Sequence, residues 1–145
     1  MKIKILTIAF LYLNFLCIPT NAITNKIVLK VENEIITNYE VKNKILTSLV
    51  LAGDEITQEN INKLKKQALE SLIQNKLKII ELKKYKINKN NSQINSYLNL
   101  VSENDITKLQ NKFENNNLDY NLFLEEVEIQ TKWQNFIYLF YKKKI

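Results

Sequence analysis

Turn-forming residues are almost missing from this chain, and their scarcity limits the folds that it can adopt. Glycine occurs once among the 145 residues, at Gly53, and proline occurs once, at Pro19. An antiparallel sandwich or barrel joins its strands by many tight turns, which depend on glycine and proline. We therefore expect a mainly helical chain. A single glycine also excludes the glycine-rich loops that cradle nucleotide phosphates.

The composition excludes several classes of function. Histidine is absent and cysteine occurs once, so a zinc finger or a histidine-bound catalytic metal is excluded. The 21 basic residues are all lysines, interspersed with 15 acidic residues, and this even mixture does not indicate nucleic-acid binding. The carboxylates of Glu125, Glu126 and Glu128 stand beside no base, nucleophile or metal ligand. We expect no enzyme activity, no catalytic residue and no cofactor.

The first 22 residues have the pattern of a secretory signal peptide. Lys2 and Lys4 form a basic start, residues 5–18 are almost wholly apolar, and the small residues Thr20 and Ala22 follow. The apolar run is shorter than the roughly 20 residues that a membrane-spanning helix needs. We therefore predict cleavage after Ala22, export of the mature chain and no stable membrane span after cleavage.

The mature chain is predicted to open with a β-hairpin. Residues 27–31 and 34–37 are rich in β-branched side chains and are separated by two residues, which is typical of paired strands with a tight turn. Asn33 is expected to take the positive φ of that turn, because asparagine adopts this region more readily than other non-glycine residues.

Helices are predicted over the remaining residues. Thr37 or Asn38 is suited to cap the first helix, and Gly53 is suited to end it in a left-handed conformation. Thr57 begins a long helix that is expected to reach Tyr85 and to organise the fold. This helix carries two adjacent apolar rows, which predict burial against more than one neighbour. The rows are Ile61, Leu64, Ala68 and Leu72, and Leu69, Ile73, Leu77 and Ile80.

The later part of the chain predicts two short helices, near residues 94–101 and 106–113, and a longer last helix. Asn104 or Asp105 is expected to cap the second short helix, and Leu118 or Asp119 to begin the last one. In all, about five helices should surround one long central helix as a single domain.

The end of the last helix is the candidate functional site. Residues 136–141 are apolar on every side of a helix, so another surface must cover them. That surface is either this chain's own core, a second copy or a client polypeptide. The candidate residues for client binding or dimerisation are Trp133, Phe136, Ile137 and Phe140. If substitution of Phe136 and Phe140 unfolds the protein, these residues are core. If it changes neither folding, client binding nor oligomeric state, the binding surface is expected between the Val41–Leu49 helix and the long helix.

Three segments together resemble the N-terminal domain of the SurA-type periplasmic chaperones. Residues 27–37, IVLKVENEIIT, are similar to the family's opening of strand, turn, strand and helix cap, with Asn33 where the family often has glycine. Residues 68–77, ALESLIQNKL, with the exit YKI at 85–87, resemble its long helix. Residues 118–123, LDYNLF, resemble the entry to its last N-domain helix.

The resemblance implies a helical chaperone domain over residues 23–145, located in the periplasm. Such a protein would hold unfolded polypeptides without ATP, outer-membrane protein precursors above all. Family members usually continue into parvulin prolyl-isomerase domains whose site uses histidine, so this chain is expected to lack isomerase activity. The alternative is a homodimeric or partner-docked domain that assembles envelope structures without binding clients.

Overall fold

A short hairpin and five helices make up residues 25–142, the part of the chain that the computed structural model describes. The predicted leader lies outside the described residues. The elements are β1 (Ile27–Val31), β2 (Glu34–Thr37), α2 (Asn38–Ala52), α3 (Gln58–Leu82), α4 (Asn91–Val101), α5 (Ile106–Asn115) and α6 (Tyr120–Tyr141). The mainly helical fold with an N-terminal hairpin, as predicted from the sequence, is confirmed.

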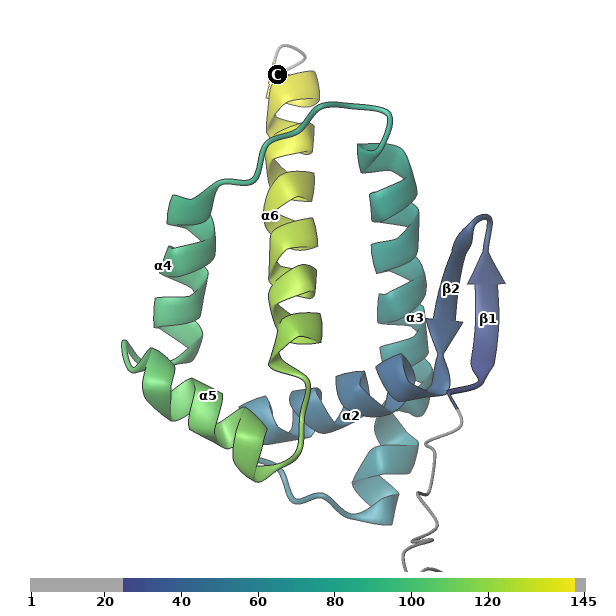
Figure 1. Cartoon of the computed structure of the whole chain (residues 1–145), viewed down its shortest axis with the longest axis vertical. Coiled ribbons are helices and arrows are strands. Elements are labelled where there is room, and N and C mark those ends of the chain that lie inside the picture. Colours follow the sequence, from purple (N-terminus) through teal and green to yellow (C-terminus); the bar gives the residue numbers. More distant parts are fainter. Residues whose placement is uncertain (1–24, 143–145) are drawn as a thin grey trace, which may run out of the picture.

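The two long helices form the centre of the fold. In Figure 1, α6 runs between α3 and α4, while α2 and α5 cross one end and the hairpin lies beside α3. Helix α6 contacts each of the other four helices, and α3 contacts α2, α6 and both strands. The long helix predicted at residue 57 onwards therefore shares its central role with α6.

The hairpin turn is present as predicted, but a different residue has the positive φ. The strands pair antiparallel with Val31 opposite Glu34, so Glu32 and Asn33 form a two-residue turn. Glu32, and not Asn33, has the positive φ, at 52°. The expectation for Asn33 was wrong because a positive φ at the first turn position alone suffices to match the twist of the flanking strands.

Both ends of α2 are set by the residues that the sequence indicated. Thr37 caps the helix: its hydroxyl accepts from the backbone N–H of Glu40 at 3.2 Å, and its own N–H donates to the Glu40 carboxylate at 2.8 Å. This is a complete capping box. Gly53 ends the helix with φ 76°, and the Asp54 N–H donates to the Leu49 carbonyl at 2.9 Å.

The capping residues of α3, α5 and α6 are also among those that the sequence indicated. Thr57 caps α3, Asp105 caps α5 and Asp119 caps α6. Helix α3 ends at Leu82, short of the expected Tyr85. The Tyr85 N–H donates to the Leu82 carbonyl at 3.1 Å, so the chain leaves the helix through a tighter i→i+3 turn.

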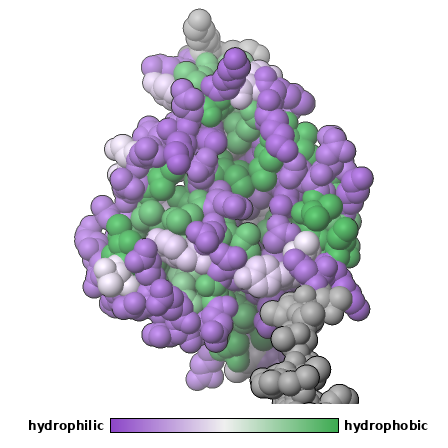
Figure 2. Space-filling view, in the orientation of Figure 1, coloured by the Kyte–Doolittle hydropathy of each residue, from purple (hydrophilic) through white to green (hydrophobic). Residues whose placement is uncertain are grey.

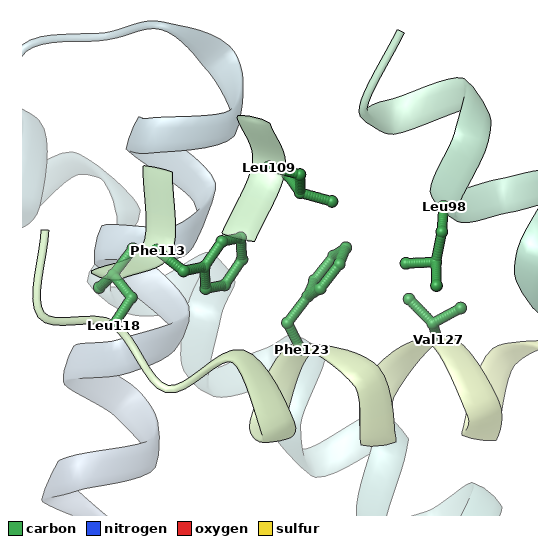
Figure 3. Close-up of a cluster of buried hydrophobic side chains, with 6 residues drawn as sticks. All are labelled: Leu98, Leu109, Phe113, Leu118, Phe123 and Val127. Atoms are coloured by element: carbon green, nitrogen blue, oxygen red, sulfur yellow. The ribbon is translucent and has the colours of Figure 1, made fainter. Parts of the chain in front are cut away.

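The main core lies where α4 and α5 meet the first half of α6. Figure 3 shows its six buried side chains, with Phe113 and Phe123 facing one another at a ring-centroid distance of 5.2 Å. A smaller cluster joins α2 to α3 and contains Ile45, Leu49 and Ala68. The six residues of the main cluster are Leu98, Leu109, Phe113, Leu118, Phe123 and Val127.

Candidate functional site

An aromatic cluster forms where the second half of α6 passes the end of α3. The Tyr85 ring lies 4.9 Å from the Phe136 ring and 4.8 Å from the Phe140 ring, measured between centroids. Phe136 also contacts Trp133 at 5.2 Å and Phe140 at 4.8 Å. These tilted and edge-on contacts are geometries in which aromatic pairs attract one another. The short turn after α3 places Tyr85 there, and for this reason residue 85 belongs to the site.

The four candidate residues separate into core and surface. Phe136 is 6% exposed, so it belongs to the interior, and Trp133 is partly buried beside it. Ile137 and Phe140 are 39% and 46% exposed. The cluster thus has an inner half that anchors α6 and an outer half that faces solvent.

The apolar surface continues to the end of the helix. Each of the residues 137–141 is a large apolar or aromatic side chain, and each is at least 39% exposed, with Leu139 highest at 60%. In Figure 2 apolar side chains lie among polar ones at this end of the molecule, and apolar surface is also visible along the edge formed by the hairpin. A run of adjacent exposed apolar side chains is typical of an interaction surface, whereas single exposed ones are normal.

A second apolar surface lies between the hairpin, α2 and α3. A groove of about 460 Å³ is lined by Val28 of β1 and by apolar side chains of both helices. Ile27 and Val28 beside it are exposed as well. The groove lies at the location expected as the alternative binding surface. Its apolar lining residues are Val28, Val41, Ile45, Leu46, Ile61 and Leu69.

The apolar run at the end of the last helix identified the residues of α6 in this cluster but not their partner on the side of α3. Tyr85 was predicted as the end of a helix, and nothing in the local pattern relates it to residues more than 50 positions away. A bulky aromatic residue at the end of an apolar row was the only available signal. The polar contacts between α2, α3 and α6 were missed for the same reason, since each joins separate helices.

Two ion pairs cross the interfaces of α2. The Lys76 ammonium of α3 contacts the Glu40 carboxylate at 2.8 Å, and both side chains are mostly buried. The Lys44 ammonium of α2 contacts the Glu126 carboxylate of α6 at 2.5 Å. Because partial burial reduces screening by solvent, these pairs constrain the packing of the three helices more than exposed pairs do.

Side-chain amides complete this polar interface. The Asn43 amide oxygen accepts from the Asp119 backbone N–H at 2.8 Å and so fixes the start of α6 against α2. Gln130 of α6 donates to Asn75 of α3 at 2.8 Å and accepts from Lys78 at 2.7 Å. Asn75 interrupts the apolar surface of α3, and its burial is accounted for by this hydrogen bond.

The stability of the α2–α3 contact is expected to depend on pH through Glu40. Burial alone would raise the pKa of Glu40, but hydrogen bonds from Lys76 and Thr37 outweigh it and hold the pKa below its ordinary value. A carboxyl whose folded pKa is lowered stabilises the fold above its unfolded pKa, about 4.3, and loses that stabilisation as the pH falls through the folded value.

Replacing Glu40 by glutamine is therefore expected to destabilise the protein by about 1–2 kcal/mol at pH 7. The difference from the wild type should shrink as the pH is lowered from about 5 towards 3. Urea unfolding at several pH values measures it. The exposed Glu114, changed to glutamine, serves as the control and should show a much smaller pH-dependent difference. A Glu40→Gln difference that grows in acid would contradict the assignment.

The described residues give no indication of metal chemistry or of a membrane span. No group of three or more carboxylates among residues 25–142 is placed to hold a metal ion. None of the described helices combines the length and the apolar character needed to cross a membrane. No protein-family model, curated protein or solved structure matches the chain.

Proposed function

We propose that this protein is an ATP-independent chaperone that holds unfolded polypeptides in the periplasm, outer-membrane protein precursors among them. One observation carries the proposal: residues 137–141 expose five consecutive large apolar or aromatic side chains at the end of α6. Burying one such side chain contributes about 1.5–3 kcal/mol. Partial burial of several of them supplies enough free energy for a passive, reversible interaction with apolar segments.

The arrangement of the aromatic cluster supports this function. Phe136 is packed against Trp133 and Tyr85, and the ring of Phe140 contacts both Phe136 and Tyr85. Phe140 is therefore already positioned in the free protein and loses less conformational freedom on binding than an unsupported side chain would. Apolar side chains recognise shape and hydrophobicity more than sequence, which suits a protein that must accept many different clients.

The test removes the exposed side chains and keeps the buried ones. A variant with Ile137, Leu139 and Phe140 all changed to serine should keep its helical circular-dichroism spectrum, because these residues are exposed. It is expected to lose most of its ability to suppress the aggregation of a chemically denatured outer-membrane protein. Leu100 on α4, 77% exposed, provides the matched control as Leu100→Ser and should leave suppression unchanged.

Sedimentation of the same variants tests the alternative, a homodimer or docked assembly domain. A wild-type protein that dimerises in both low and high salt, does not suppress aggregation and becomes monomeric in the triple variant would establish that alternative. A triple variant that stays folded and retains full suppression would place client binding elsewhere. The groove between the hairpin, α2 and α3 would then be the next surface to test.

A further inference from the structure

The groove between the hairpin, α2 and α3 has mainly apolar walls. Its volume of about 460 Å³ is within the range of about 300–1,000 Å³ that is common for ligand pockets. Its lining residues lie at positions 38, 41, 42, 45 and 46 of α2 and at 58, 61, 65 and 69 of α3, so each helix contributes one face. Walls of this kind bind apolar groups by removing them from water.

A β-bulge on β1 contributes the third side of this groove. The register of the hairpin shifts between Ile27 and Leu29, and Val28 has no partner residue in β2. Bulges re-aim a side chain and are common beside binding sites. Val28, the extra residue of this bulge, lines the groove. The bulge therefore marks the groove as a candidate binding surface independently of its volume.

The apolar surface continues from the groove along β1. Ile27, Val28 and Leu29 are 64%, 48% and 37% exposed. Strand β1 pairs with β2 alone, so its other edge carries backbone groups without a strand partner, and in Figure 1 it forms the outer edge of the hairpin. A surface that extends from a groove onto a free strand edge is larger than a compact ligand needs. It suits a segment of polypeptide.

Two lysines give this apolar groove a positive charge. Lys42 and Lys65 line it, both are exposed, and no acidic residue lines it. Neither lysine forms an ion pair with a carboxylate of residues 25–142. Two other lysines of α3, Lys63 and Lys66, instead pair with glutamates of their own helix at 2.7 Å and 3.8 Å. The single acidic residue of α2, Glu40, is already paired with α3.

The charge of the groove decides between a second copy and a different partner. The exposed apolar residues 137–141 are followed in the sequence by three lysines, and the apolar run at residues 5–18 is preceded by two. Either segment of this chain would bring like charges to the groove. A segment with carboxylates beside its apolar residues would instead complement Lys42 and Lys65.

We propose that this groove binds a polypeptide segment of another protein that combines apolar side chains with aspartate or glutamate. The apolar side chains enter the groove, and the carboxylates pair with Lys42 and Lys65. The inference rests on the proposed function and adds to it a second client surface, which selects among apolar segments by their charge.

The test compares two capped, fluorescently labelled peptides that share a core of alternating valine and leucine. One has glutamate at both ends and the other has lysine. In an anisotropy titration at low salt, the glutamate peptide is expected to bind the wild type about fivefold more tightly than the lysine peptide. The difference should shrink in about 0.5 M salt, because salt screens exposed charges.

Two double variants with the same net charge locate this preference. Lys42→Gln combined with Lys65→Gln should reduce the difference between the peptides to about twofold or less. Lys63→Gln combined with Lys66→Gln changes lysines that do not line the groove and should leave the difference at about fivefold. All four side chains are exposed, so both variants should keep a helical circular-dichroism spectrum.

Val28→Ser tests the apolar wall separately from the charges. This substitution at an exposed position should weaken the binding of the glutamate peptide about threefold without unfolding the protein. Leu100→Ser on α4 is the matched control and should bind the peptide as the wild type does.

Three results would overturn the inference. The two peptides bind equally tightly, the two lysine double variants behave alike, or the fatty acid dodecanoate binds at the groove where the glutamate peptide does not. The triple serine variant of the α6 end separates this inference from the proposed function, because it should lose aggregation suppression and keep the preference for glutamate. A wild type that shows this preference but suppresses no aggregation would support the groove and contradict the proposed function.

Discussion

Replacing Phe113 by alanine is expected to lower the free energy of unfolding by about 3–5 kcal/mol, a large share of the stability of a domain of this size. Phe113 is fully buried, and its ring contacts those of Tyr120 and Phe123 at 5.2 Å each. It joins α5 to the start of α6 (Figure 3), so the cavity left by alanine cannot close without moving one of these helices.

Urea denaturation followed by circular dichroism measures the effect. Single domains have a total stability of about 5–15 kcal/mol, so the variant is expected to be partly unfolded at 37 °C. Phe113→Leu leaves a smaller cavity and should lose less stability. A loss below about 1 kcal/mol for Phe113→Ala would show that α5 is not an integral part of the core.

The second large effect is expected at Phe136, and it separates the two halves of the aromatic cluster. Phe136→Ala should lower the free energy of unfolding by about 3 kcal/mol, because the ring is buried between Trp133 and Tyr85. Phe140→Ala, at an exposed position of the same helix, should lower it by about 1 kcal/mol or less.

Both variants are measured for stability and for client binding, because the two effects together show whether each residue acts through the fold or at the binding surface. We expect Phe140→Ala to weaken aggregation suppression while the fold remains stable, and Phe136→Ala to act through the fold. Tryptophan fluorescence of Trp133, the single tryptophan of the chain, monitors the cluster in both variants. Equal losses of stability at the two positions would mean that the outer half of the cluster is buried as well.

The residues that cap the helices were the most predictable part of this structure. Thr37, Gly53 and Thr57 cap their helices as the sequence indicated, because capping depends on groups within a few residues of one another. The two apolar faces of α6 follow from the helical spacing of their residues: Phe123 and Val127 pack towards α4 and α5, while Leu122 and Ile129 lie on the side of α2 and α3. Both features are local, and local sequence determines them.

The partners across the fold were not predictable. A periodic pattern shows which face of a helix is apolar, but it does not show which helix that face meets. Asn75 and Gln130 pair across α3 and α6, and Tyr85 reaches Phe136, over separations of about 50 residues that no local rule covers. The dihedral of Glu32 was missed for a different reason, since the turn allows more than one position to hold the positive φ.

The central place of α6 has a consequence for the order in which the molecule can fold. Helix α6 contacts every other helix, yet it is the last of the described helices to be synthesised. Asn43 and the Asp119 backbone that it binds are separated by 76 positions, which ribosomes translate in about 4–15 s. During that interval the hairpin can pair and α2 can pack on α3 through Ile45, Leu49 and Ala68, but none of these elements has α6 to pack against. The polar side chains of Asn43 and Lys44 keep hydrated a part of the α2 face that α6 later covers. This hydration lowers the tendency of α2 to associate with other nascent chains.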